Sequence, residues 1–227
     1  MSKKLTLASV AVLVAAGFGL WAFAPQETSE SLLPGSSAQA QETAPAATEA
    51  AVTEIKDMTL GPVDAKVTVI EYASYTCPHC ANFHASVFKD LKKDYIDTGK
   101  IHFVYREVYF DRYGLWAAMT ARCGGEMKYF GVQDMLFKDI QAWAGSDDPN
   151  VVVGNLKTIG RAAGMDDAQL DACLKDGAKA QAMVTHYEET MKEFDVQGTP
   201  TLIVNGTKHS NMSYAELKTI LDAELAK

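Results

Sequence analysis

The pattern of hydrophobic and polar positions predicts a strand, a helix and a second strand at the start of the folded part. Residues 66–75 are rich in β-branched and aromatic side chains, and their nearly continuous apolar run predicts a strand buried on both faces of a sheet. Large apolar residues from Phe83 to Leu91 recur at helical spacing, which predicts a helix to about Tyr95. Residues 101–108 alternate as a second strand does.

Helical periodicity dominates the middle of the chain. Residues 113–177 are rich in Ala, Met and Leu, with breaks at Gly124-Gly125 and at residues 145–150. This pattern predicts roughly three or four short helices, and residues 178–194 predict a longer one.

The end of the chain predicts a hairpin and a final helix. Residues 201–207 form a short strand that runs into an Asn-Gly turn, which is a strong hairpin signal. Ser213 followed by Glu216 forms a capping box at the start of an amphipathic helix that runs to Lys227. All these elements together predict an α/β sheet with a helical insert.

The first 24 residues predict export from the cytoplasm. Lys3 and Lys4 precede an uncharged apolar stretch at 5–24, which is typical of a signal peptide and also long enough for a membrane anchor. Small residues suited to a signal peptidase stand at 22–24, where a proline follows, and at 38–40, unusually far from the apolar stretch. Either late cleavage or anchoring places the domain in the periplasm.

Residues 25–54 carry almost no large apolar side chains and predict a disordered linker.

The composition of the whole chain limits the classes of protein to which it can belong. The net charge of −8 argues against a nucleic-acid-binding protein, which needs a surplus of Lys and Arg. Four cysteines are too few for a disulfide-stapled mini-protein, and 48% hydrophobic residues can build a packed core.

The candidate for reactive chemistry is Cys77-Pro78-His79-Cys80, where the first strand meets the first helix. Pro78 suits the first turn of a helix, so Cys77 falls at the helix N-terminus, where unpaired N–H groups and the helix dipole stabilise a thiolate. His79 adds a donor or partial charge. Cys80 lies one turn further in and is expected to be more buried. We therefore expect attack by Cys77 and resolution by Cys80.

Three other interpretations of this motif compete with a redox pair. Haem attachment needs a histidine directly after the second cysteine, and Ala81 occupies that place. A zinc site would have to recruit His84 and a distant cysteine, because the chain has no second paired-ligand motif. A purely structural disulfide would need neither a helix start nor a Pro-His pair between its cysteines.

Two segments, Val69–Phe83 and Val196–Pro200, together resemble the DsbA branch of the thioredoxin superfamily. The resemblance covers roughly residues 55–227. It implies a thioredoxin fold in two parts, 55–108 and 178–227, separated by a helical insert at 109–177.

The resemblance also implies further site residues. In that family the late proline is cis and faces the active disulfide, which implies this place for Thr199 and Pro200; from the segment alone, a proline at a strand start is often only an edge feature. The family has a buried acidic residue six positions before the first cysteine, and Glu71 matches it. The alternative for Glu71 is a strand-end carboxylate facing solvent.

The resemblance implies a periplasmic dithiol oxidase that needs no metal and no dissociable cofactor. A substrate thiolate attacks the Cys77–Cys80 disulfide, a mixed disulfide forms through Cys77, and the second substrate thiol resolves it. Substrates are then reduced or unfolded exported proteins, and a quinone-linked membrane oxidase recycles the enzyme. The alternatives are an isomerase or reductase of the same superfamily, a holdase or thiolate metal-binding protein, and a structural, adhesin-like protein.

The remaining candidates are less specific. Cys123 and Cys173 favour a structural disulfide outside the cytoplasm, with buried free thiols or a second redox pair as alternatives. The scattered histidines are interpreted as surface or strand-packing residues: His84, His102, His186 and His209. Five aromatic residues are expected in the core: Tyr72, Tyr75, Phe83, Phe103 and Tyr105. Three others are expected to border the active site and contact substrate: Tyr109, Phe110 and Trp116.

Overall fold

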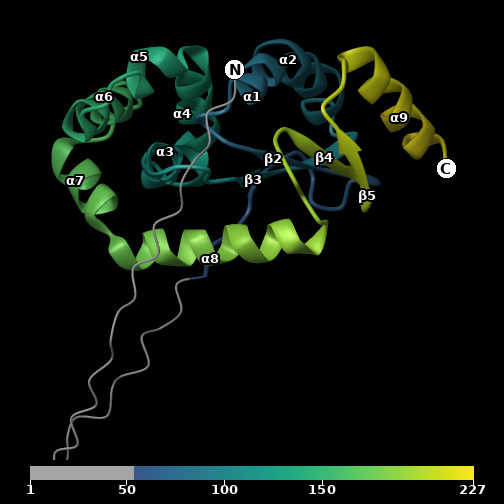
Figure 1. The fold of residues 1–227 in the computed structure, drawn as a ribbon. Coiled ribbons are helices and arrows are strands. Elements are labelled where there is room, and N and C mark those ends of the chain that lie inside the picture. The colour runs from purple at the N-terminus through teal and green to yellow at the C-terminus, as the bar shows by residue number, and fades with distance from the viewer. Residues whose placement is uncertain (1–53) are drawn as a thin grey trace, which may run out of the picture. The chain divides into compact units, whose positions relative to one another are not determined.

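A five-stranded sheet in the order β1-β3-β2-β4-β5 lies at the centre of the fold (Figure 1). The computed structural model describes residues 54–227, so the predicted signal or anchor at 1–24 and the linker up to residue 53 lie outside the described residues. The strands are β1 (Met58–Leu60), β2 (Val67–Ala73), β3 (Ile101–Glu107), β4 (Thr201–Val204) and β5 (Thr207–Ser210).

The central position of β2 explains its apolar sequence. It pairs in parallel with β3, from Val67 opposite Ile101 to Ala73 opposite Glu107, and antiparallel with β4. A parallel pair needs a crossover, and the helix that follows β2 supplies it. Strand β1 was not predicted, because a three-residue edge strand is too short to show periodicity.

The crossover helix begins at Pro78 and ends at Ile96, which confirms the predicted helix. It alternates between α-helical and π-helical turns: α1 (Pro78–Phe83), η1 (His84–Phe88), α2 (Lys89–Leu91) and η2 (Lys92–Ile96). Turns of the π type are rare in proteins, and those that do occur are often found at functional sites.

The insert contains five helices instead of three or four: α3 (Arg112–Cys123), α4 (Glu126–Lys138), α5 (Ile140–Ala144), α6 (Pro149–Ala162) and α7 (Asp167–Lys175). The break at Gly124-Gly125 is confirmed, and the second break is shorter than predicted, because α5 ends at Ala144 and α6 already begins at Pro149. The extra helix arises at Asp139, which ends α4 and whose side chain then accepts a hydrogen bond from the N–H of Ala142 to begin α5. No glycine or proline marks that boundary.

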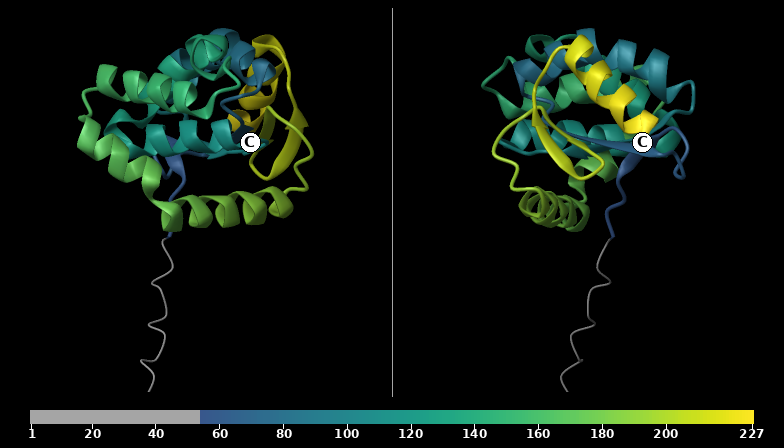
Figure 2. Two further views of the ribbon diagram at one scale, coloured as in Figure 1. Left: turned by 60° about the vertical axis from the view of Figure 1, so that its left-hand side comes forward. Right: turned by 90° about the vertical axis from the view of Figure 1, so that its right-hand side faces the viewer.

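Helices cover both faces of the sheet (Figures 1 and 2). Helix α8 (Gly177–Glu193) crosses one face, while the crossover helix and α9 (Tyr214–Ala226) lie on the other. The predicted capping box of Ser213 and Glu216 is present at the start of α9. The predicted hairpin joins β4 and β5, with positive φ angles at Asn205 and Gly206 as an Asn-Gly turn requires.

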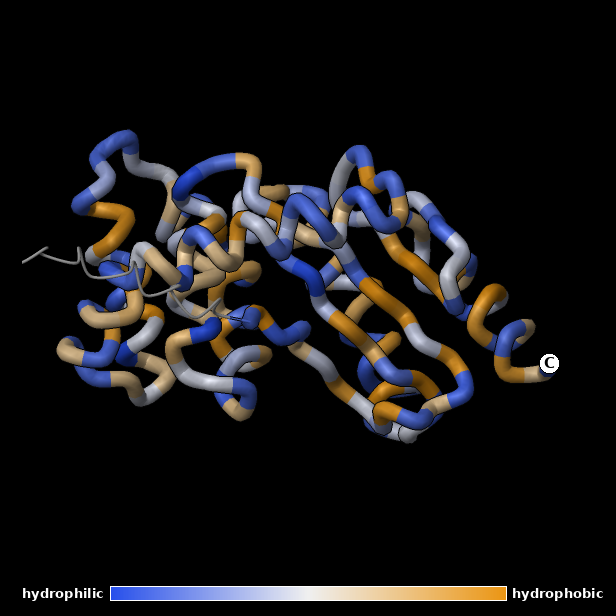
Figure 3. The backbone as a smooth tube through the Cα atoms, turned by 90° about the horizontal axis from the view of Figure 1, so that it is seen from below, coloured by the Kyte–Doolittle hydropathy of each residue, from blue (hydrophilic) through white to orange (hydrophobic). Residues whose placement is uncertain are grey.

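The largest fully buried side chains are mostly aromatic. Hydrophobic residues run along the inner strands β2, β3 and β4, whereas the edge strand β5 is polar (Figure 3). All five aromatic residues expected in the core are at most 2% exposed: Tyr72, Tyr75, Phe83, Phe103 and Tyr105. His84 corrects the prediction for the histidines. It is buried on the crossover helix, where its ring stacks on Phe88 and its Nε2 lies 2.6 Å from a carboxylate oxygen of Asp134.

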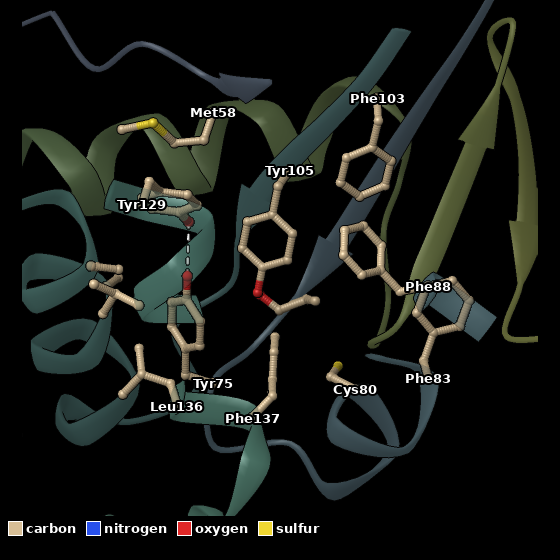
Figure 4. Packing of buried hydrophobic residues seen from close by; sticks show 14 of the residues in the cluster. Met58, Tyr75, Cys80, Phe83, Phe88, Phe103, Tyr105, Tyr129, Leu136 and Phe137 are labelled. Carbon is tan, nitrogen blue, oxygen red and sulfur yellow. Dashed lines mark hydrogen bonds between the residues drawn. The ribbon is translucent and has the colours of Figure 1, made fainter. Parts of the chain in front are cut away.

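A buried polar network joins the insert to the sheet. Arg122 of α3 donates two hydrogen bonds to Glu107 at the end of β3, and both side chains are less than 5% exposed. The hydroxyl of Tyr129 donates to Glu107 (2.7 Å) and accepts from Tyr75 (2.9 Å), as Figure 4 shows for the tyrosine pair. Such a buried ion pair is tolerated because further hydrogen bonds satisfy it.

A disulfide between Cys123 and Cys173 closes the insert. It links the end of α3 to α7, with 5.8 Å between the two Cα atoms and a sequence separation of 50. On the chain-entropy model a loop of this length contributes on the order of 4 kcal/mol to the free energy of unfolding. The disulfide therefore fixes α7 against α3.

Candidate active site

Cys77 is the N-cap of the crossover helix. Its backbone is extended (φ −91°, ψ 116°), and its carbonyl accepts hydrogen bonds from the N–H groups of Cys80 and Ala81, each 3.1 Å long. Pro78 occupies the first helical position, where a missing N–H costs nothing. The Cys77 sulfur therefore lies at the positive end of the helix and is partly exposed.

The environment lowers the pKa of Cys77 to about 5. The main cause is a hydrogen bond from the Cys80 thiol, with further hydrogen bonds from Thr199 and from the backbone N–H groups of Cys80 and His79; partial burial opposes them. The exposed His79 contributes through its backbone. Cys77 is consequently a thiolate at neutral pH.

Cys80 has the opposite character. It is fully buried beside the aromatic cluster of Figure 4, and its pKa is raised well above the ordinary cysteine value. The causes are its hydrogen bond to the Cys77 sulfur, burial and the nearby carboxyl of Glu71, in that order among those that raise it. The two sulfurs differ strongly in acidity although they are only three residues apart.

The segment before β4 lies against Cys77. The peptide bond between Thr199 and Pro200 is cis, and the Cys77 sulfur lies 3.6 Å from the carbonyl oxygen of Thr199, which accepts a hydrogen bond from Cys77 while its thiol is protonated. The Thr199 hydroxyl also lowers the pKa of both cysteines. The fold thus brings Thr199 and Pro200, 122 residues further along the chain, to the active-site sulfur.

Glu71 lies inside the protein, 1% exposed, so the solvent-facing alternative is wrong. It stands in the middle of β2, opposite Tyr105 of β3 and Leu202 of β4. One of its carboxylate oxygens has no hydrogen-bond partner among the described residues, and burial raises its pKa to about 8. At neutral pH this carboxyl is therefore mostly protonated.

Asp111 is a site residue that the sequence analysis missed. One carboxylate oxygen accepts a 2.7 Å hydrogen bond from the hydroxyl of Thr76, the residue before Cys77. The other accepts a 2.9 Å bond from the N–H of Gly114 and caps α3. An aspartate three residues before Gly114, ahead of a helical stretch, is a recognisable N-cap signal, but nothing local shows its second bond to Thr76.

The three expected substrate-contact residues lie around this loop. Phe110 precedes Asp111 and is 57% exposed, which suits contact with a partner. Tyr109 packs edge-on against Tyr187 of α8, and the partly buried Trp116 packs against Tyr113. No hydrogen bond or ring contact joins Tyr109 or Trp116 to residues 77–80 within the described part of the chain.

Within residues 54–227, no helix combines the length and the apolar composition that a membrane span needs. No group of three or more His, Cys, Asp and Glu side chains in this range could hold a metal ion.

The chain is similar to a thioredoxin family model and to proteins named for disulfide chemistry. The family model described as thioredoxin matches residues 53–223. The putative protein-disulfide oxidoreductase of Rickettsia bellii is 34% identical over 167 residues, which are 73% of this chain and 63% of the relative. The chain thus spans slightly less than two thirds of that relative. Disulfide bond formation protein D of Bacillus subtilis is 26% identical over 176 residues, 73% of this chain and 76% of the relative.

Solved structures of other proteins have a similar fold. Alpha-DsbA1 from Wolbachia pipientis superimposes with a TM-score of 0.69 at 26% identity, over 78% of this chain and 94% of that one. Oxidised BdbD from Bacillus subtilis gives a TM-score of 0.66 at 25% identity, over 75% and 94% of the two chains.

The acidity of Cys77 gives a first prediction. In the reduced protein the ultraviolet absorbance of the thiolate should titrate with a midpoint near pH 5. In Cys80→Ala the midpoint should rise, because the largest stabilising hydrogen bond is lost. A wild-type midpoint near the ordinary cysteine value of about 8.5 would contradict this account.

The same pKa has a consequence for stability. The unfolded chain keeps the Cys77 proton up to about pH 8.5, whereas the folded protein has released it above about pH 5. The contribution of Cys77 to the free energy of unfolding of the reduced protein should therefore rise with pH between these values, whereas the buried Glu71, whose pKa is raised, contributes in the opposite direction. Denaturant titrations of the reduced wild type and of Cys77→Ala isolate the Cys77 contribution, because the difference between the two proteins should rise with pH.

Asp111 gives a second prediction, with a matched control. Asp111→Ala and Asp166→Ala each remove the side-chain cap of an insert helix and should lower the free energy of unfolding by about 1 kcal/mol. Only Asp111→Ala also frees Thr76, so only it should slow the reaction of Cys77 with a dithiol peptide, by roughly three- to tenfold. Equal rates in the two variants would show that Asp111 is merely a cap.

Proposed function

Because the chain belongs to the thioredoxin family and is DsbA-like, we propose that it is a protein disulfide oxidoreductase that oxidises the dithiols of exported proteins. The observation that carries this proposal is the contrast between a stabilised Cys77 thiolate and a buried, protonated Cys80. A reduced form stabilised in this way makes the disulfide a strong oxidant, because reducing it gains the free energy of the thiolate.

The proposed reaction has two exchanges. A substrate thiolate attacks the Cys77 sulfur of the oxidised enzyme, a substrate–Cys77 bond forms, and the Cys77–Cys80 bond breaks with its electron pair on the Cys80 sulfur. The second substrate thiolate then attacks the first substrate sulfur and releases Cys77 as a thiolate. The substrate loses two electrons and gains a disulfide, while the enzyme is left reduced, with Cys77 as a thiolate and Cys80 as a thiol.

We assign Glu71 the role of proton donor to Cys80 in the first exchange. A buried sulfur with a raised pKa is a poor leaving group unless it receives a proton. Glu71 is mostly protonated at neutral pH, is buried, and interacts electrostatically with Cys80. A carboxyl with a pKa near the working pH is suited to proton transfer.

The proposed location rests on the N-terminal sequence, and the proposed partners rest on the family resemblance. Residues 5–24 support export to the periplasm, either as a cleaved signal or as an anchor. A quinone-linked membrane oxidase, as in DsbA systems, would restore the Cys77–Cys80 disulfide after each turnover. Reduced exported proteins would be the substrates.

The reduction potential of the Cys77–Cys80 pair tests the proposed direction. Equilibration with glutathione should give a reduction potential of about −120 mV, whereas a potential of about −270 mV would indicate a reductase. Cys77→Ala should abolish peptide oxidation, and Cys80→Ala should react with the disulfide form of a peptide and accumulate the mixed disulfide through Cys77, because no Cys80 thiol is present to resolve it. Activity that survives in Cys77→Ala would overturn the mechanism and favour a holdase.

The role of Glu71 is tested by the pH dependence of the first exchange. Stopped-flow measurement of mixed-disulfide formation, corrected for the fraction of substrate thiolate, should show a decrease above about pH 8 as Glu71 loses its proton. Glu71→Gln should slow this step by roughly a hundredfold and remove the decrease. The exposed Glu189→Gln is the matched control; a Glu71→Gln profile identical to wild type would refute the assignment.

A further inference from the structure

A pocket of about 530 Å³ lies between the crossover helix and α4. It follows both π-helical stretches of the crossover helix, since His84, Phe88 and Lys92 all line it. Because π turns are rare and concentrate at functional sites, their position beside a pocket is a reason to ask what the pocket binds. The active-site chemistry described above uses no residue that lines this pocket.

The floor of the pocket is apolar. Ala81, Ala85 and Phe88 follow one face of the crossover helix, and Phe137 faces them from α4. The buried His84 fills the space between the two phenyl rings, with ring centroids 4.7 Å from Phe88 and 4.9 Å from Phe137. This floor suits an apolar side chain.

The rim carries positive charge. Lys89, Lys93 and Lys138 line the pocket and are exposed, and none has an acidic partner within salt-bridge distance among residues 54–227. Of the two aspartates at the pocket, Asp97 pairs with Lys92, and a carboxylate oxygen of Asp134 lies 2.6 Å from the Nε2 of His84. On a chain with a net charge of −8, three unpaired lysines around one pocket form a local site for acidic groups.

The pocket begins close to the reactive sulfur. Ala81, at its near end, donates its N–H to the carbonyl of Cys77. Along a helix axis Ala81 and Phe88 lie about 6 and 16 Å from Cys77, at about 1.5 Å per residue. An extended chain attached at Cys77 would cover this span with roughly two to five residues.

The geometry points to a second docking site, the lysine pocket, for polypeptide substrates. It would take an apolar side chain flanked by Asp or Glu, roughly two to five residues from the cysteine that Cys77 attacks. This inference rests on the proposed function, because it assigns a substrate preference to the same active site. A polypeptide is favoured as occupant because the nearest lining residue, Ala81, lies one helical turn from Cys77, within reach of a substrate chain attached there.

Two matched dithiol peptides test the preference. One carries Glu-Phe-Glu about four residues from its first cysteine, and the other carries Gln-Phe-Gln at the same place. The wild type should oxidise the acidic peptide with a kcat/KM roughly tenfold higher, and added salt should reduce the ratio. A ratio near one in the wild type would overturn the inference.

Charge variants locate the effect. In Lys89→Gln/Lys93→Gln/Lys138→Gln the ratio should fall to about one, while Lys175→Gln/Lys179→Gln/Lys192→Gln, with the same change in net charge, should keep the wild-type ratio. Ala85→Trp should also lower the ratio, because it fills the apolar floor from an exposed position and leaves the lysines in place. An equal loss in both triple variants would mean a general charge effect and would refute the site.

Direct binding separates this inference from the proposed function. A cysteine-free Glu-Phe-Glu peptide with a fluorescent label should bind the wild type and not the pocket triple variant, by anisotropy. Binding without oxidation of either dithiol peptide would refute the proposed function and leave the site standing. Oxidation of both peptides at equal rates without binding would refute the site alone. Pocket-dependent binding to phosphatidylglycerol vesicles, with none to the peptide, would overturn the choice of a polypeptide.

Discussion

The hydrogen bond between the two sulfurs is the interaction on which the site depends. It lowers the pKa of Cys77 and raises that of Cys80, so one contact produces both a reactive thiolate and a thiol that stays protonated. The bond requires Cys77 at the helix N-cap and Cys80 one turn inside, with Pro78 setting the first turn between them. The sheet, the cis peptide before β4 and the buried Glu71 all meet at this pair, so the fold can be understood as the support that holds two cysteines in unequal surroundings.

The sequence could predict the local features because their causes are local. A proline after Cys77, helical spacing from Phe83 and an Asn-Gly turn each act over a few residues. Glu71 is different: its burial depends on β3 and β4 pairing on either side of it, and only the family resemblance singled it out. The resemblance likewise supplied the place of Pro200, since no local signal brings residues 122 positions apart together.

The features that escaped prediction are long-range or lack a sequence signal. Strand β1 exists only because β3 offers an edge to pair with, and Asp111 serves the site through Thr76, 35 residues earlier. The boundary between α4 and α5 rests on a single aspartate. The π turns of the crossover helix follow no pattern that helical periodicity detects, yet they shape the lysine pocket beside the site.

The ion pair between Glu107 and Arg122 bears on how this architecture can be recombined. Its acidic half belongs to the sheet and its basic half to the insert, and both are buried. A chimera that received the insert of another protein, without an arginine in this place, would leave a lone carboxylate in the interior at a cost of about 3–5 kcal/mol. The insert is therefore not a detachable module: sheet and insert are matched halves, and exchange between relatives would have to carry both charges together.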